Sequence, residues 1–235
     1  MGKKGLIIAI DGPSAVGKST IARLIAHELG YLYVETGAIY RAITWKVLKD
    51  KIDLNNEVII IDLVSRINIS MKSANNQSEE NFRIFIDGEE VTKEIRSPEI
   101  DKYVSQIARI PKIRGKLVSI QRNLAKNGKV VMEGRDIGSK ILPHADIKFF
   151  FTASEEARIQ RRFRELIEKG YQVNYEEVKE QIIKRDFIDS QRKYAPLVKT
   201  KDAIVIDSTH KSIIEVKEEI MGIIDRIKKG RKVEN

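Results

Sequence analysis

The chain has 235 residues, of which 42% are hydrophobic and 33% charged, and it carries a net charge of +9 at pH 7. This length suits one sizeable core, or one core with a small appended unit, and no stretch approaches the roughly 20 apolar residues that span a bilayer. Cysteine is absent, which excludes disulfides and thiolate metal sites. We therefore expect a protein of a reducing, cytoplasmic compartment with no membrane segment.

Short apolar runs alternate with longer helical patterns along most of the chain. Residues 6–10 form a continuous apolar run that predicts a strand buried on both faces, and the helical pattern that follows stops at Gly30. Further strands are predicted at residues 31–34, 130–132, 147–151 and 203–206. Strands that alternate with helices predict an α/β fold in which helices cover both faces of a parallel sheet.

One region breaks this alternation. Residues 67–91 contain two runs of period two, separated by a polar gap, and Asp87-Gly88 is typical of a hairpin turn. Ser97-Pro98 then predicts a helix start with Pro in the first turn. We predict an insertion at residues 65–110 that holds a small antiparallel sheet, between core segments 1–64 and 111–235.

Two further helix starts are predicted near the middle of the core segment 111–235. Ser154 precedes an acidic first turn, which suits the positive pole of a helix that we expect to run to Lys169. Asn174 has Glu177 three residues later, the spacing of a capping box. We expect two consecutive helices here, before the last predicted strand.

A glycine-rich loop joins the first predicted strand to the first predicted helix. Its sequence matches the pattern G-x-x-x-x-G-K-[ST], in which backbone N–H groups surround a polyphosphate, the lysine reaches the β- and γ-phosphates, and the Ser19 hydroxyl can ligate Mg²⁺. The pattern predicts an ATP site formed by Gly12, Pro13, Ser14, Ala15, Val16, Gly17, Lys18, Ser19 and Thr20.

A phosphate loop alone does not say where the phosphoryl group goes. The base-reading pattern N-K-x-D of GTPases is absent, and ATP-driven motors are usually longer than this chain. A kinase for small molecules needs a second anion site, with cations that neutralise charge during transfer. Arg135 and Asp136 follow a buried strand directly, where open α/β sheets bind ligands, whereas Arg41 suits either this site or an ordinary helix surface. Glu133 suits water-mediated contact with Mg²⁺ or a structural role.

Two predicted helices carry further arginines. Arg158, Arg161 and Arg162 share one helix face, and their repulsion is relieved either by a bound anion or by the nearby carboxylates of Glu155, Glu156 and Glu165. Arg185, Asp189 and Arg192 share another face, where Arg185 and Asp189 can equally form a simple i,i+4 ion pair.

The chain resembles the bacterial cytidylate kinases over residues 6–224. The resemblance is carried by the segments IDGPSAVGKST, ETGAIYRA, SQIARIPKIR, EGRDIG, KRDFIDSQR and APLV…DAIVIDST, in this order. It implies a P-loop nucleoside monophosphate kinase fold with a five-stranded parallel sheet, an insertion that binds the monophosphate and a helical lid at about residues 155–195. It also implies transfer of the ATP γ-phosphate to CMP or dCMP with Mg²⁺.

The resemblance also implies roles for individual residues. Those expected around the CMP phosphate or sugar are Thr36, Arg41, Arg135, Arg185 and Arg192, and Asp189 is expected at the ribose hydroxyls. Cytosine contacts are expected from Ser105, Arg114 and Asp136, and ATP phosphate contacts from Arg158, Arg161 and Arg162. The catalytic set is Lys18, Arg135, Arg161, Arg185 and Arg192. Thr36 replaces an expected Ser, and Ile188 stands where a basic residue is common.

Two alternatives remain open at this point. The chain can be a kinase for another monophosphate, such as UMP or AMP, or a basic P-loop protein that binds RNA. The basic residues are spread along the chain, and their one cluster, at residues 226–232, suits a solvated helix end. We expect no nucleic-acid partner, and the resemblance implies a monomer.

Overall fold

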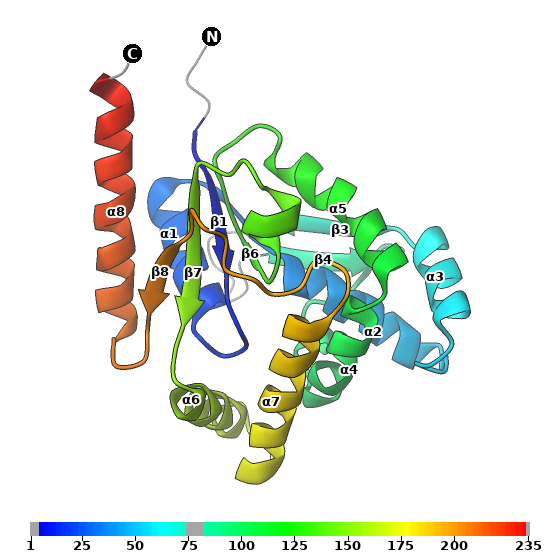
Figure 1. Ribbon diagram of the computed structural model, residues 1–235. Helices are drawn as coiled ribbons and strands as arrows, with labels where there is room; N and C mark the ends of the chain where they lie inside the picture. Colours follow the sequence, from blue (N-terminus) through cyan, green and yellow to red (C-terminus); the bar gives the residue numbers. More distant parts are fainter. Residues whose placement is uncertain (1–4, 74–81, 234–235) are drawn as a thin grey trace.

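The computed structural model describes residues 5–73 and 82–233, and a five-stranded parallel sheet forms its centre (Figure 1). The strand order is β2-β6-β1-β7-β8. The bounds are β1 (Ile7–Asp11), β2 (Leu32–Glu35), β6 (Val130–Gly134), β7 (Ile147–Thr152) and β8 (Ile204–Asp207). All five predicted strands are confirmed. Each ends one or two residues later than predicted, because polar residues such as Asp11 and Glu35 continue the extended backbone beyond the apolar run.

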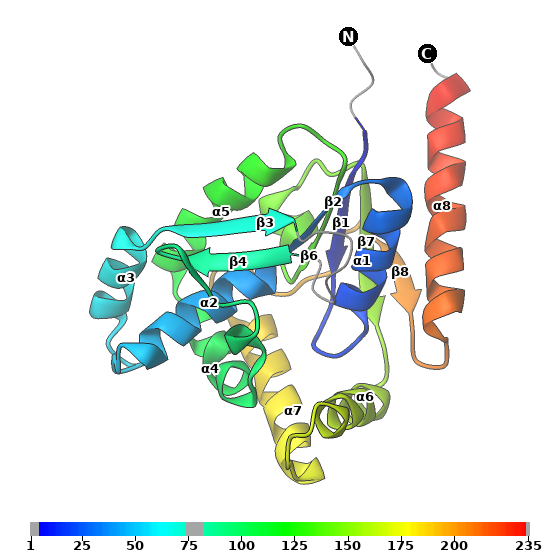
Figure 2. The same cartoon turned by 180° about the vertical axis from the view of Figure 1, so that it is seen from behind.

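Helices cover both faces of the sheet. Helices α1 (Lys18–Leu29) and α8 (Ile213–Val233) lie on one face, where residues such as Ile25 and Ile220 pack against β1 and β7 (Figures 1 and 2). The other face packs against α5 (Pro111–Ala125) and the one-turn π-helix η2 (Ile137–Ile141). Helix α2 (Thr36–Lys49) begins directly where β2 ends. These helices leave the carboxyl ends of the strands uncovered, and other loops and helices build the site there.

A second, smaller sheet lies beside the core, on helix α2. It consists of the antiparallel strands β3 (Ile69–Ser73), β4 (Phe82–Ile86) and β5 (Glu89–Glu90), and the turn between β4 and β5 is the predicted Asp87-Gly88, whose φ angles are 50° and 87°. The polar gap of the predicted insertion, at residues 74–81, lies outside the described residues. Around this sheet lie α3 (Glu57–Arg66), η1 (Glu94–Arg96) and α4 (Pro98–Ala108).

Helices α6 (Glu155–Glu168) and α7 (Tyr175–Gln191) form a helical hairpin with an apolar cluster of its own, which includes Ile159, Leu166 and Val178. The hairpin lies beyond the carboxyl ends of the strands (Figure 1). Ser154 caps α6 as predicted, whereas the Asn174 side chain accepts from the N–H of Glu176 at 2.8 Å rather than from that of Glu177. No described helix is long and apolar enough to cross a membrane.

The connection between β6 and β7 holds an element that the sequence did not predict. The buried carboxylate of Asp11 accepts from the backbone N–H groups of Ile137 at 2.8 Å and of Gly138 at 2.7 Å, and so holds the start of η2 against the end of β1. Burial raises the pKa of Asp11 to about 6, because it outweighs the two N–H donors. This contact places Arg135 and Asp136, which lie between β6 and η2, beside the glycine-rich loop.

Candidate active site

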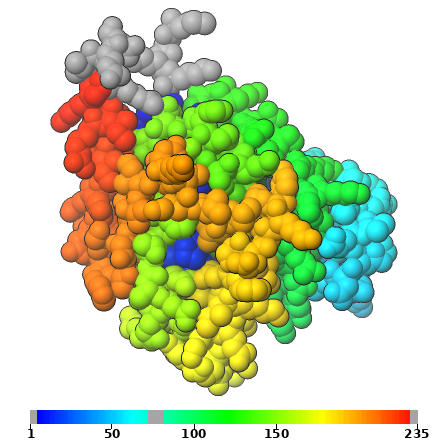
Figure 3. Space-filling view, viewed as in Figure 1, coloured from blue at the N-terminus to red at the C-terminus, as the bar shows by residue number. Residues whose placement is uncertain are grey.

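A cleft of about 670 Å³ opens at the carboxyl ends of the central strands. It is lined by the glycine-rich loop, by α2 and α4, by the end of β6 and by the helical hairpin. Figure 3 shows the N-terminal segment, in blue, at the bottom of a hollow between segments coloured green, yellow and orange. Every site residue named above lines the cleft except Gly12, Pro13 and Arg158.

The glycine-rich loop adopts the backbone that its sequence demands. Gly12 and Gly17 have φ angles of 151° and 88°, and a Cβ at Gly12 would lie 2.5 Å from the backbone oxygen of Phe151. Lys18, the first residue of α1, is buried and donates from Nζ to the carbonyl of Pro13 at 2.6 Å. Burial, and then the charge of Arg135, lower the pKa of Lys18 to about 7. A bound anion in the loop would favour the protonated amine of Lys18 and so raise this pKa again.

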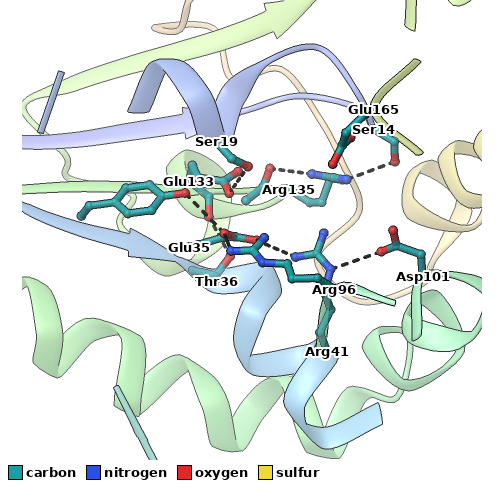
Figure 4. Close-up of polar contacts among 12 residues, drawn as sticks. Ser14, Ser19, Glu35, Thr36, Arg41, Arg96, Asp101, Glu133, Arg135 and Glu165 are labelled. Atoms are coloured by element: carbon teal, nitrogen blue, oxygen red, sulfur yellow. Dashed lines mark hydrogen bonds and ion pairs between the residues drawn. The ribbon is translucent and has the colours of Figure 1, made fainter. Parts of the chain in front are cut away.

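Glu133 joins two of the predicted site residues. The Ser19 hydroxyl donates to Glu133 Oε1 at 2.9 Å, and the buried Thr36 hydroxyl donates to the backbone carbonyl of Glu133 at 2.8 Å (Figure 4). Thr36 thus directs its proton toward the end of β6. Among residues 5–73 and 82–233 no group of three His, Asp or Glu side chains is placed to hold a metal ion. A hydroxyl and one carboxylate still suit Mg²⁺ that is also bound to phosphate oxygens.

A buried ion pair forms another wall of the cleft. Arg114 pairs with Asp136, and both side chains are at most 4% exposed. The Arg114 guanidinium lies 5.2 Å from the centre of the Tyr40 ring, and Arg192 Nη2 lies 3.7 Å from Asp136. Asp136 Oδ2 and Arg192 Nη2 are buried without a hydrogen-bond partner. Because buried polar atoms rarely stay unpaired, this wall suits a polar ligand.

Arg135 connects this wall to the glycine-rich loop. Its Nε lies 2.8 Å from Asp189 Oδ2, and its Nη2 donates to the Ser14 hydroxyl at 3.2 Å. Asp189 also pairs with Arg192 at 3.3 Å. Burial opposes the ionised form of Asp189, but the charges of Arg135, Arg185 and Arg192 outweigh it and lower the pKa of this carboxyl. The cleft therefore holds two neighbouring cationic regions, one at the loop and one beyond Arg135.

Comparison with known proteins shows the family of the chain. The family model described as cytidylate kinase matches residues 8–226. The chain belongs to the cytidylate kinase family. It is 48% identical to the cytidylate kinase of Geobacillus sp. over 95% of this chain and 98% of that protein. It is 46% identical to the cytidylate kinase of Clostridioides difficile over 94% and 98% of the two chains.

Likeness to solved structures concerns the fold alone. An uncharacterized protein from Eubacterium ventriosum superposes with a TM-score of 0.50 at 14% identity, over 95% of this chain and 99% of that one. For a member of the cytidylate kinase family, the parallel sheet with its phosphate loop and the small antiparallel sheet confirm the predicted fold class.

The three arginines predicted on one face of α6 take different partners. Arg158 pairs with Asp186 and donates to the Ser14 carbonyl at 3.2 Å. Arg161 donates to the Ser208 hydroxyl at 3.1 Å, on the loop after β8. Arg162 pairs with Glu165 at 2.7 Å and with Asp101. Only one of the three carboxylates expected to compensate this face, Glu165, is seen to do so, because Asp186 and Asp101 reach the arginines from other helices.

The cleft of this cytidylate kinase family member also contains charged residues that sequence reasoning missed. The buried carboxylate of Glu35 pairs with Arg41 at 2.5 Å and with Arg96 at 3.1 Å (Figure 4). Those two arginines outweigh burial and hold the pKa of Glu35 below its usual value. Asp101 pairs with Arg41 at 3.2 Å. Asp186 does not line the cleft itself, but its Oδ1 accepts from the Ser14 N–H of the glycine-rich loop at 3.0 Å. One signal was available for Glu35, which is the last residue of β2, beside Glu133 near the end of β6.

Two remaining predictions concern α7. Asp189 pairs with Arg135 and Arg192, and Arg185 Nη1 lies 3.5 Å from Asp101, so the alternative of an Arg185–Asp189 pair is not what the side chains adopt. Ile188 is partly buried on the same helix.

Ser105, on α4, is buried and lines the cleft together with Arg114.

Proposed function

We propose that this protein transfers the γ-phosphate of ATP to CMP or dCMP, giving the diphosphate and ADP. The observation that carries this proposal is the pairing of a phosphate loop with a second cationic region in one cleft. Lys18 and Arg135 lie on the two sides, and Arg135 donates to Ser14 of the loop. A site of this kind can hold two phosphorylated molecules end to end.

The reaction needs alignment and charge neutralisation more than a general base. A nucleotide monophosphate is largely dianionic at neutral pH, so it can attack the γ-phosphorus in line without losing a proton to the protein. Lys18 and Arg135 would neutralise charge on the oxygens of the transferring group. The helical hairpin would act as the lid that excludes water, and the small sheet with α4 as the unit that carries the acceptor.

Acceptor recognition would fall to the wall around Asp136. Its unpartnered Oδ2 can accept from the exocyclic amino group of cytosine, and Arg114 and Ser105 would hold the other polar edge of the base. Arg41, Arg185 and Arg192 would bind the acceptor phosphate, Thr36 would lie beside it, and Asp189 would accept from the ribose hydroxyls. Because uracil has a carbonyl where cytosine has an amino group, a carboxylate at this place favours cytosine.

Mg²⁺ would bind at the Ser19–Glu133 pair. We propose that the Ser19 oxygen ligates the ion, that Glu133 orders its water ligands, and that ATP phosphates complete the shell. When bound, the ion would neutralise charge on the β- and γ-phosphates. Arg161 and Arg162, which line the cleft from α6, would lie on the ATP side of the transferred group.

A panel of monophosphates tests the proposal. ADP release is measured with ATP and Mg²⁺ in the presence of CMP, dCMP, UMP, AMP or GMP, with Lys18→Ala as the control for contaminating kinases. The proposal requires the largest kcat/KM for CMP or dCMP, and no turnover by the control. Faster phosphorylation of UMP or AMP, or no stimulation of ATP consumption by any monophosphate, would contradict it.

A further inference from the structure

Asp101 lies where three parts of the molecule meet. It belongs to the first turn of α4, beside the small sheet, and its Oδ1 lies 3.2 Å from Arg41 Nε of α2 and 3.5 Å from Arg185 Nη1 of α7. Its Oδ2 pairs with Arg162 of α6. This one carboxylate, which belongs to the insertion, thus contacts both the core and the two helices of the hairpin. Figure 4 shows Asp101 facing Arg41 at the edge of the arginine cluster.

The charges around this contact make the carboxylate hard to replace. Arg185 is partly buried near Arg135 and Arg41, so burial and these two charges lower its pKa to about 10, although Asp101 opposes them. Burial also disfavours the ionised form of Asp101, yet Arg41, Arg185 and Arg162 outweigh it and bring its pKa to about 2. The carboxylate is therefore ionised at neutral pH. Without it, arginines from three helices would repel one another across the cleft.

Other carboxylates cannot supply the same connection. Glu35 holds Arg41 from the start of α2, and Glu165 holds Arg162 from within α6, so each keeps an arginine close to its own part of the chain. Asp101 differs because two of its three partners, Arg162 and Arg185, belong to the hairpin and not to its own part of the chain. The hairpin has its own small apolar cluster, so its place relative to α4 depends on such contacts at its edge.

We propose that Asp101 is a positioning residue that docks the helical hairpin onto the insertion and thereby sets Arg162 and Arg185 at the transferring phosphates. The proposal deepens the function proposed above and rests on it for the identity of the ligand. Asp101 does not touch the reacting atoms. It acts through the two arginines, and through the closed position of the hairpin, which keeps water from the γ-phosphate.

A distance measurement without nucleotide tests the docking itself. The chain has no cysteine, so Glu94→Cys on η1 and Glu180→Cys on α7 give two unique sites for spin labels on exposed residues. The distance distribution is compared for Asp101, Asp101→Asn and Glu99→Gln. Glu99 is the matched control, because it is an exposed carboxylate in the same first turn of α4. We expect Asp101→Asn to shift the distribution to longer distances, and Glu99→Gln to leave it unchanged.

Kinetics then separates positioning from simple loss of structure. We expect Asp101→Asn to lower kcat by about tenfold and to raise the fraction of ATP that is hydrolysed by water, because a displaced hairpin admits water. Asp101→Glu, which keeps the charge, should recover part of both changes, and circular dichroism reports whether each variant is folded. An unchanged distance distribution in folded Asp101→Asn would overturn the proposal. Since this measurement needs no substrate, it stands apart from the question of which monophosphate is the acceptor.

Discussion

The Ser19 hydroxyl donates to Glu133 Oε1 at 2.9 Å, across 114 positions of sequence. The parallel register explains this contact, because Glu133 on β6 pairs with Ile10 on β1, and the glycine-rich loop begins where β1 ends. The sheet therefore brings one acidic residue to the first turn of α1, where the phosphates and Mg²⁺ are proposed to bind. The carboxylate is nearly fully buried, so its orientation is fixed by its surroundings.

Glu133→Gln should change the Mg²⁺ dependence of the reaction. The amide keeps the shape and can still accept from Ser19, but it lacks the charge that would order water around the ion. We expect activity at limiting Mg²⁺ to fall about tenfold and to recover partly as Mg²⁺ is raised. Initial rates against Mg²⁺ at fixed ATP measure this, with exposed Glu177→Gln as the control. The same Mg²⁺ profile for both variants would remove Glu133 from the proposed ion site.

Asp136→Asn should affect both stability and base selectivity. The substitution leaves the Arg114 guanidinium buried without its paired carboxylate, a change that costs about 3 kcal/mol of unfolding free energy. It also replaces an acceptor by a group that can donate to the uracil carbonyl. We expect the ratio of kcat/KM for CMP to that for UMP to fall. Urea unfolding and the two kinetic assays measure these effects, and an unchanged ratio would contradict the cytosine contact.

Arg135→Ala should damage acceptor turnover more than ATP binding. Arg135 pairs with Asp189 at 2.8 Å, and its hydrogen bond to the loop goes to the Ser14 hydroxyl. We expect kcat/KM for CMP to fall about a hundredfold while the Kd for ATP changes little. Titration calorimetry with ATP and steady-state kinetics with CMP give both values, and exposed Arg109→Ala serves as the control. A larger change in the Kd for ATP than in kcat/KM for CMP would place Arg135 at the ATP phosphates and not at the acceptor.

The sequence predicted what depends on local pattern and missed what depends on tertiary contacts. The glycine-rich loop and the five strands follow from apolar runs and glycine spacing, and Ser97 and Ser154 were recognised as helix caps. The role of Asp101 was not predicted, because a carboxylate in the first turn of a helix is common. Nothing in the local sequence shows that arginines of α2, α6 and α7 contact it. Asp11 was missed for a similar reason: its two N–H partners lie more than 100 residues away.

The lowered pKa of Lys18 gives the last prediction, a proton linkage. Burial brings this pKa from 10.5 to about 7. Between these two values the unfolded chain binds more protons at this site than the folded protein, so the Lys18 contribution to stability increases as pH rises from 7 to 10.5. ATP binding shifts the protonation of Lys18 in the opposite direction to folding. Its phosphates favour the charged amine, so binding should take up a proton and weaken as pH rises above 7.

Calorimetry at pH 8 in buffers of different ionisation enthalpy measures that proton directly. We expect net proton uptake when a non-hydrolysable ATP analogue binds to the unaltered protein, and none attributable to this site in Lys18→Met, which keeps the length of the side chain without its charge. The variant should also lose about a thousandfold in kcat, because it removes one of the cations proposed to neutralise charge on the transferring group. Proton uptake of equal size in both proteins would show that Lys18 is already charged in the empty cleft. The lysine would then bind phosphate without the change in protonation that its burial predicts.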